Sequence, residues 1–222
     1  MPVSFPDNNR IKTAVITGGH SFDVPGFHAV FRSMTEVDFY PQSLDNFVDD
    51  AGKVRDNYDA LVFFNMQIPM PDERTRAVLE KLGESDQGIV VLHHALLDHE
   101  EWDLWSDIVG IKDRSIRDAA HGVSLPMTVV NTEHPITKGM SDFEIIDETY
   151  LMDDPGEGSD ILLTTEHDVS MKNVAWARQF RNARVFCYQS GHDNQTYVDP
   201  NFRKVLESGI HWVAGRLGIR DT

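Results

Sequence analysis

Short apolar runs alternate with amphipathic stretches in the first half of the chain. Runs of strand length cover residues 13–16, 60–64 and 88–92, and helix-like stretches cover 27–34, 71–82 and 100–109. This alternation predicts a parallel, doubly wound sheet with helices on both faces. The helix at 71–82 is the best marked, because Pro71 suits a first helical position and Gly83 suits a left-handed cap.

Beyond about residue 115 the pattern changes, and strand candidates follow one another without long helices. These candidates span residues 124–130, 143–146, 161–164, 174–180 and 185–189. We expect them to form an antiparallel extension of the same sheet. Asp199 as N-cap and Pro200 in the first turn predict a closing helix. With no repeat or linker, the pattern predicts one α/β domain over residues 1–222.

The composition limits the classes of partner. The chain has 36 acidic and 20 basic residues and a formal net charge of −16, which repels phosphate backbones and anionic lipid. We therefore expect neither nucleic acid nor a membrane as partner, and a cytoplasmic location, since no apolar run approaches membrane-spanning length. The single cysteine, Cys187, lies in an apolar run and is predicted to be a core residue. The sequence does not decide whether the protein forms a homo-oligomer.

Histidines follow three of the predicted strands directly. His20 follows the first strand, His93 and His94 follow the strand 88–92, and His192 follows the last strand. Any one of these could be a loop residue placed by chance. Because ligands of open parallel sheets bind at the carboxyl ends of the strands, the three together predict a functional site at that edge.

Two local patterns refine this prediction. If His93 and His94 both continued the strand, their side chains would point to opposite sides, and only one would face a shared pocket. The sequence does not say which. The pair Gly18 and Gly19 lacks the third glycine of a nucleotide fingerprint, so we expect no nucleotide cofactor.

Further candidates come from the second half of the chain. Strand alternation places Glu148 and Tyr150 on one face and Asp147 on the other. Glu148 is then either a base or ligand beside a phenol, or a solvated acid on an edge strand. His121 precedes a strand without an obvious packing role, and Trp176 either lines a pocket or fills the core.

Taken together, these motifs resemble the ThuA-like family over almost the whole chain, from about Thr13 to Gly215. The resemblance rests on the segments Val15 to His20, Leu92 to Ala95, His121, His134 to Met140, Asp147 to Tyr150, Trp176, Gly191-His192 and Tyr197 to Pro200.

The resemblance implies a flavodoxin-like architecture similar to class I glutamine amidotransferases, and a role in the use of sugars, including keto-sugars. It does not imply glutaminase activity, because His93 and His94 stand at the strand exit where an amidotransferase carries its cysteine. Matched motif positions imply a site of His20, His93, His121, Glu148 and His192. Asp147 and Tyr150 are then supporting groups. The substrate-binding candidates are His20, His94, Asp147 and Trp176.

Histidine and glutamate side chains suit acid and base chemistry next to a carbonyl. The leading hypothesis is therefore an enzyme that isomerises a sugar or keto-sugar, or eliminates a group from it. Catalysis is assigned to His93, His121, Glu148, Tyr150 and His192. If the four histidines of the site converge with Glu148, they could hold a divalent metal, with zinc as the natural choice and hydrolysis as a third reaction. The alternative is a sugar-binding or regulatory protein without catalysis.

Overall fold

The computed structural model describes residues 5–6 and 8–217, which build one sheet of nine strands. The strands lie in the order β2-β1-β3-β4-β9-β8-β7-β5-β6. Their bounds are β1 Ile11–Gly18, β2 Val37–Ser43, β3 Ala60–Asn65, β4 Gly88–Leu92, β5 Asp118–Val129, β6 Phe143–Leu151, β7 Ser159–Thr164, β8 Asn173–Phe180 and β9 Ala183–Tyr188.

The direction of the strands changes in the middle of the sheet. The five strands β2, β1, β3, β4 and β9 are parallel, whereas β8, β7, β5 and β6 continue the sheet with antiparallel pairs. The expected antiparallel extension is therefore present. The description "mainly parallel" is only partly right, since the sheet is mixed. Phe180, the last residue of β8, and Ala183, the first of β9, are joined by a tight turn, which can connect only antiparallel neighbours.

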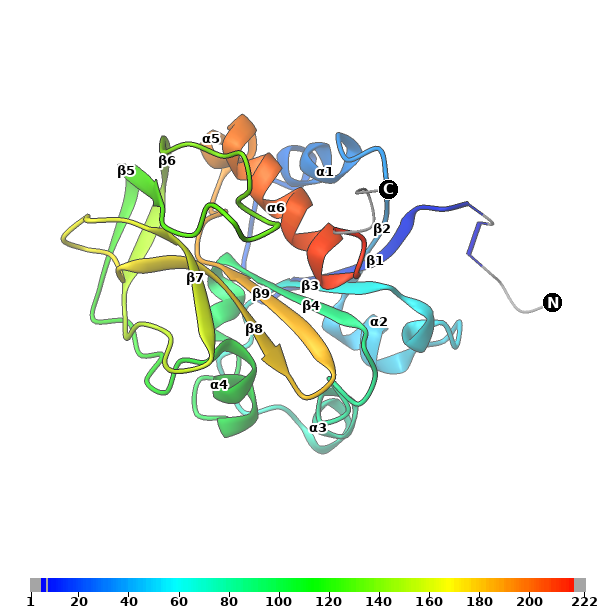
Figure 1. Cartoon of the computed structure of the whole chain (residues 1–222). Helices are drawn as coiled ribbons and strands as arrows, with labels where there is room; N and C mark the ends of the chain where they lie inside the picture. Colours follow the sequence, from blue (N-terminus) through cyan, green and yellow to red (C-terminus); the bar gives the residue numbers. More distant parts are fainter. Residues whose placement is uncertain (1–4, 7, 218–222) are drawn as a thin grey trace.

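Helices cover both faces of the sheet (Figure 1). One face carries α1 and α6, and the other carries α2, α3 and α4. The bounds are α1 Val24–Arg32, α2 Leu44–Asp49, α3 Glu73–Leu79, α4 Asp103–Val109, α5 Asn194–Tyr197 and α6 Pro200–Val213, with short 3-10 helices η1 Arg55–Asn57 and η2 His93–Leu97. Within the described part of the chain, no helix has the length and apolar character needed to cross a membrane.

Each face of the sheet has its own apolar core. Phe27 and Phe31 of α1 and Phe202 of α6 pack on one face, while Phe47 of α2 and Trp105 of α4 pack on the other. The strands between them are buried on both sides, which explains their continuous apolar runs. Because the two cores hold the strands in place, the carboxyl ends of the parallel strands lie together at one edge of the sheet.

Strand β2 and helix α3 are among the elements that differ from the sequence prediction. Strand β2 was not predicted, because its half-buried sequence contains Pro41 and polar residues, as an edge strand tolerates. Helix α3 is shorter than residues 71–82, because Asp72 is its N-cap and accepts a hydrogen bond from the Thr75 N–H. Gly83 does adopt a positive φ, of 78°, but in a turn beyond the end of the helix at Leu79.

Candidate active site

His20, His93 and His192 lie at the carboxyl edge of the parallel strands, and β6 contacts the chain around His192. Two contacts fix β6 there. Asp147 accepts hydrogen bonds from the backbone N–H groups of Gly191 and His192, and Thr196 donates its hydroxyl to the Ile146 carbonyl. Residues far apart in the sequence therefore surround one point at this edge.

That point is the carboxylate of Glu148. We call Glu148, His93, Tyr150 and His192 together the Glu148 centre. Glu148 Oε2 lies 2.8 Å from His192 Nδ1 and 3.1 Å from His93 Nε2, and it accepts a 2.7 Å hydrogen bond from the Tyr150 hydroxyl. Its other oxygen, Oε1, lies 3.1 Å from His121 Nδ1. Both oxygens of one buried carboxylate thus face imidazole rings.

His93 reaches the centre because the chain turns sharply where β4 ends. Its φ is 54°, a left-handed conformation that is unusual for a residue with a side chain and costs about 1–3 kcal/mol. Its Nδ1 lies 2.8 Å from the carbonyl oxygen of Gln189, which can only accept, so Nδ1 carries the hydrogen. The other ring nitrogen, Nε2, faces Glu148, Tyr150 and His192.

His192 is held by its own backbone and by the loop around it. Asp147 binds its N–H, and the Tyr197 hydroxyl donates to its carbonyl over 3.0 Å. The preceding Gly191 has a φ of 128°, a region that favours glycine. The loop therefore presents the His192 ring, whose side chain is 22% exposed, at the mouth of the centre.

The contacts within the centre change how its groups ionise. Burial raises the pKa of Glu148, but hydrogen bonds from His192, His93 and Tyr150 outweigh it, and the net pKa is well below its usual range. The hydrogen bond to Glu148 raises the pKa of His192. Burial and the Glu148 charge raise the pKa of Tyr150. The centre therefore contains a firmly ionised carboxylate, a phenol that keeps its proton, and a histidine that holds its proton more strongly than usual.

The remaining histidines differ in their contacts. His94 is buried, its Nε2 lies 3.1 Å from the Phe64 carbonyl, and burial next to His93 and His20 lowers its pKa to about 2. It therefore stays neutral. His20 is exposed, with its ring centroid 4.7 Å from that of His94 and 6.1 Å from that of His192. The strand does not continue through His93, because η2 begins there, and the His93 and His94 ring centroids are 4.9 Å apart. Of the two, His93 contacts Glu148 and His94 contacts the Phe64 carbonyl.

Two substrate-binding candidates do not face the centre. Trp176 is fully buried in the core on the face of α4, and its indole N–H donates to the Val109 carbonyl over 2.8 Å. Asp147 is 1% exposed and is occupied by backbone donors. Trp176 is therefore a packing residue, and Asp147 positions the loop before His192. Cys187 is buried as predicted.

A buried scaffold behind His93 was missed at the sequence level. Arg114 donates to the carbonyls of five residues between Leu96 and Trp102, and the Asp98 carboxylate accepts from the Asn65 amide and the Gln67 N–H. Together these groups hold η2 and the loop after it. Arg114 binds these backbone carbonyls and the Ser106 hydroxyl, and such contacts leave no pattern in the sequence, so no signal could have identified it.

Three atoms of the centre have a spacing that suits a divalent cation. His93 Nε2, Glu148 Oε2 and His192 Nδ1 are separated by 2.8, 3.1 and 3.2 Å. Ligand atoms in a tetrahedral zinc site lie about 3.3 Å apart, so an opening of a few tenths of an ångström would admit the ion. The Gln189 carbonyl on His93 Nδ1 is also the outer contact that orients a metal-binding histidine. The residues therefore fit a zinc-like cation.

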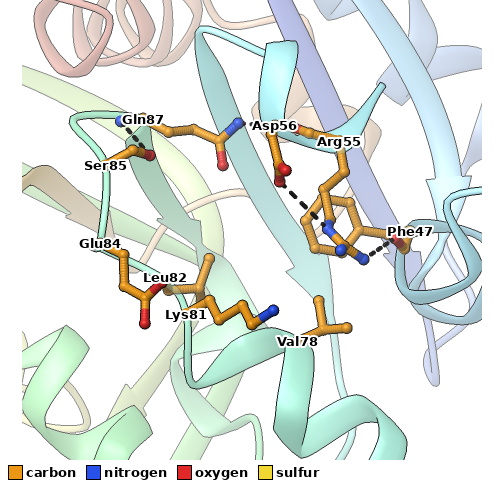
Figure 2. A pocket seen from close by; sticks show the side chains of 10 residues that line it. Phe47, Arg55, Asp56, Val78, Lys81, Leu82, Glu84, Ser85 and Gln87 are labelled. Carbon is orange, nitrogen blue, oxygen red and sulfur yellow. Dashed lines mark hydrogen bonds and ion pairs between the residues drawn. The ribbon is translucent and has the colours of Figure 1, made fainter. Parts of the chain in front are cut away.

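A hollow of about 400 Å³ lies at the opposite edge of the sheet, where β3 and β4 begin (Figure 2). Two of its polar side chains, Arg55 and Gln87, bind backbone carbonyls of the fold. Arg55 donates to the carbonyls of Phe47 and Val48, and the Gln87 amide donates to those of Arg55 and Tyr58. The hollow lies away from the Glu148 centre and has no part in it.

Solved structures share this architecture. A ThuA-like protein of Parabacteroides merdae has a TM-score of 0.75 and 23% identity, with 94% of this chain and 92% of that chain covered. A ThuA-like protein of Bacteroides uniformis has a TM-score of 0.75, 17% identity and coverage of 96% and 95%. A glutamine amidotransferase of Thermotoga maritima has a TM-score of 0.58, 9% identity and coverage of 91% and 98%. The fold is thus that of the amidotransferase-like α/β proteins.

Within that class, the sequence defines the family. The family model named ThuA, described as trehalose utilisation, matches residues 26–213. The chain therefore belongs to the ThuA family. A comparison with curated protein sequences gives no match.

Proposed function

We propose that this protein is a sugar-utilisation enzyme that acts on a keto-sugar by moving a proton next to the carbonyl group. The observation that carries the proposal is the convergence of His93, Tyr150 and His192 on one oxygen of Glu148, at the edge where ligands of such sheets bind. The description of the family supports a sugar as the ligand.

Each residue of the Glu148 centre has its own role in this proton transfer. Glu148 holds His192 Nδ1 and raises the pKa of the ring, as a carboxylate does for a catalytic histidine. His192 then takes the proton from the carbon next to the carbonyl. Tyr150 keeps its own proton and turns that hydrogen from Glu148 Oε2 toward the enolate oxygen as negative charge develops there. In an isomerisation the proton is delivered to the former carbonyl carbon, while the hydroxyl proton of the neighbouring carbon passes to the enolate oxygen. In an elimination the enolate re-forms the carbonyl and expels the group on the next carbon.

A divalent cation is a second possibility for the same atoms. His93, Glu148 and His192 would hold it, and when bound it would polarise the sugar carbonyl. In that case His192 Nδ1 is a ligand and cannot carry the proton. His121 takes over this role, because its side chain is 65% exposed and faces the other Glu148 oxygen. Hydrolysis becomes the third reaction to test.

Glutaminase chemistry is not proposed. The strand exit that would need a thiolate carries His93, and the single thiol, Cys187, lies in the core, where burial raises its pKa. The alternative that stays open is a sugar-binding or regulatory protein on the same scaffold.

The proposal is tested with protein that carries no His-tag, incubated with 3-keto-glycosides and followed by NMR, with metal content measured in parallel. We expect a new product from the wild type and none from His192→Ala. A His28→Ala variant is the control, because His28 lies on α1 and contacts Phe39. Saturable binding without any product would refute the enzyme and support the binding protein. Zinc that is retained by His28→Ala and lost by His192→Ala would assign the cation to the centre.

A further inference from the structure

A second hollow opens at the same edge of the sheet as the Glu148 centre. Its volume is about 370 Å³, within the range of ligand pockets, and we call it the β1–β3 crevice. It lies where β1, β2 and β3 end, and its lining includes Thr17, Gly19, Asp45, Asp72 and His99. Since β2 and β3 lie on opposite sides of β1, this is the switch point of the parallel half of the sheet.

The chemistry of the crevice suits a neutral ligand with many hydroxyl groups. Hydroxyl, amide and carboxylate side chains line it, including Thr17, Gln67, Asp45 and Asp72. Among the described lining residues there is no lysine or arginine, so a phosphate group would meet two carboxylates and no positive side chain. Carboxylates accept hydrogen bonds from hydroxyl groups, as sugar-binding requires.

His99 gives an independent indication that a ligand belongs here. Its side chain lines the crevice and the residue is 2% exposed. Its Nδ1 lies 2.7 Å from the Pro69 carbonyl and therefore carries the hydrogen, which leaves Nε2 as an acceptor. That Nε2 is buried and has no hydrogen-bond partner within the described part of the chain. A buried acceptor without a donor is costly, and a ligand hydroxyl would supply the donor.

The backbone of His99 adds to this picture. Its φ is 47°, a left-handed conformation in which a residue with a side chain is strained by about 1–3 kcal/mol. The edges of Trp102 and Trp105 pack against its ring, with centroids 5.7 and 6.2 Å away. The ring is thus held in place even though one of its nitrogens lacks a partner.

The crevice and the Glu148 centre are joined by a short piece of chain. Gly19 lines the crevice, and the next residue, His20, has its ring 6.1 Å from that of His192. Consecutive Cα atoms are about 3.8 Å apart, so the chain that lines the crevice runs directly into a ring beside His192. A Cβ on Gly19 would come within 2.0 Å of the Met66 carbonyl oxygen, so only glycine fits at this connection.

We propose that the β1–β3 crevice is a second subsite, which binds the non-reacting sugar of a disaccharide while the other sugar reacts at the Glu148 centre. This inference rests on the proposed function. The family description already names a disaccharide. The inference assigns its outer sugar to the crevice and makes His99 a residue that recognises a hydroxyl of that sugar.

The test compares two probes, the 3-keto derivative of trehalose and the 3-keto derivative of methyl glucoside. Their affinities are measured by calorimetry on the Glu148→Gln variant, and their KM values are measured on protein with an intact centre. We expect the disaccharide to bind about tenfold more tightly, a gap of about 1.4 kcal/mol. Asp45→Trp, which fills the crevice from an exposed position on α2, should abolish this preference. Asn46→Trp, exposed on the same helix and not part of the lining, should leave it unchanged.

The outcomes separate the two proposals. Equal affinities for both probes, or a preference that survives Asp45→Trp, would refute the subsite while leaving the reaction intact. Tight disaccharide binding that Asp45→Trp removes, without any product from the wild type, would refute the reaction and retain the subsite. Binding of inorganic phosphate in the crevice, detected by shifts of the Gly18 and Gly19 amide signals, would overturn the assignment of a neutral ligand.

Discussion

Replacing Glu148 by glutamine removes the charge of the centre and keeps its shape. The carboxylate oxygen Oε2 accepts from Tyr150 and lies 2.8 Å from His192 Nδ1, and the residue is only 6% exposed. A hydrogen bond to a charged group contributes about 1 kcal/mol more than a neutral one, so two bonds give about 2 kcal/mol in the free energy of unfolding. For a protein of this size, that lowers the melting temperature by about 4–8 °C.

The loss should depend on pH in a defined direction. His192 has a raised pKa, so its contribution to stability is present below its ordinary pKa of 6.5 and is lost as the pH rises through its folded pKa. Glu148 has a lowered pKa, so its contribution is present above its ordinary pKa of 4.5 and is lost as the pH falls through its folded pKa. The gap between wild type and Glu148→Gln is therefore larger at about pH 5.5 than at about pH 9.

Urea unfolding at the two pH values measures this gap, and NMR titration of His192 measures its pKa directly. The pKa of His192 should fall in Glu148→Gln, since the hydrogen bond to Glu148 is what raises it. Glu144→Gln, exposed on the same strand, is the control and should change neither quantity. A gap that is equal at both pH values or grows toward high pH, or an unchanged His192 pKa, would refute the reasoning.

Three further predictions concern the scaffold, the core and the cation. Arg114→Met should lower the free energy of unfolding by about 3–5 kcal/mol, because the buried carbonyls it binds lose their donor; a loss below about 1 kcal/mol in urea unfolding would contradict this role. Trp176→Phe should lower the free energy of unfolding by about 1–3 kcal/mol, since the Val109 carbonyl loses its partner. It should leave the sugar affinity measured by calorimetry unchanged. Weaker sugar binding would show that Trp176 belongs to the site. Zinc affinity, measured by competition with a chelator, should fall as the pH falls through the pKa of His192, because a protonated ring cannot bind metal; an affinity independent of pH would exclude His192 as a ligand.

The fold could be predicted where the sequence pattern reflects burial directly. Strand β4 has the predicted bounds, because all of its residues are buried on both faces and form one apolar run. The first part of β5 and the whole of β2 were missed. Their half-exposed residues need no apolar pattern, and the pairing with neighbouring strands that stabilises them is not local in the sequence.

The sequence indicated which residues form the candidate site better than it indicated how they are arranged. Strand alternation placed Glu148 beside Tyr150, and the two do share a hydrogen bond. The same rule does not apply to His93 and His94, because η2 replaces the strand there. Nothing in the sequence marks the positive φ of His93, since residues other than glycine adopt it only where the surrounding structure enforces it.

The most direct test of the account is exchange of hydrogen for deuterium next to the carbonyl of a 3-keto-glycoside in D₂O, followed by NMR. Proton transfer by the Glu148 centre predicts deuterium at that carbon with the wild type, whichever product forms afterwards, and none above the buffer rate with a Glu148→Gln, His192→Ala double variant. Exchange at the buffer rate with the wild type, or full exchange with the double variant, would contradict the central claim.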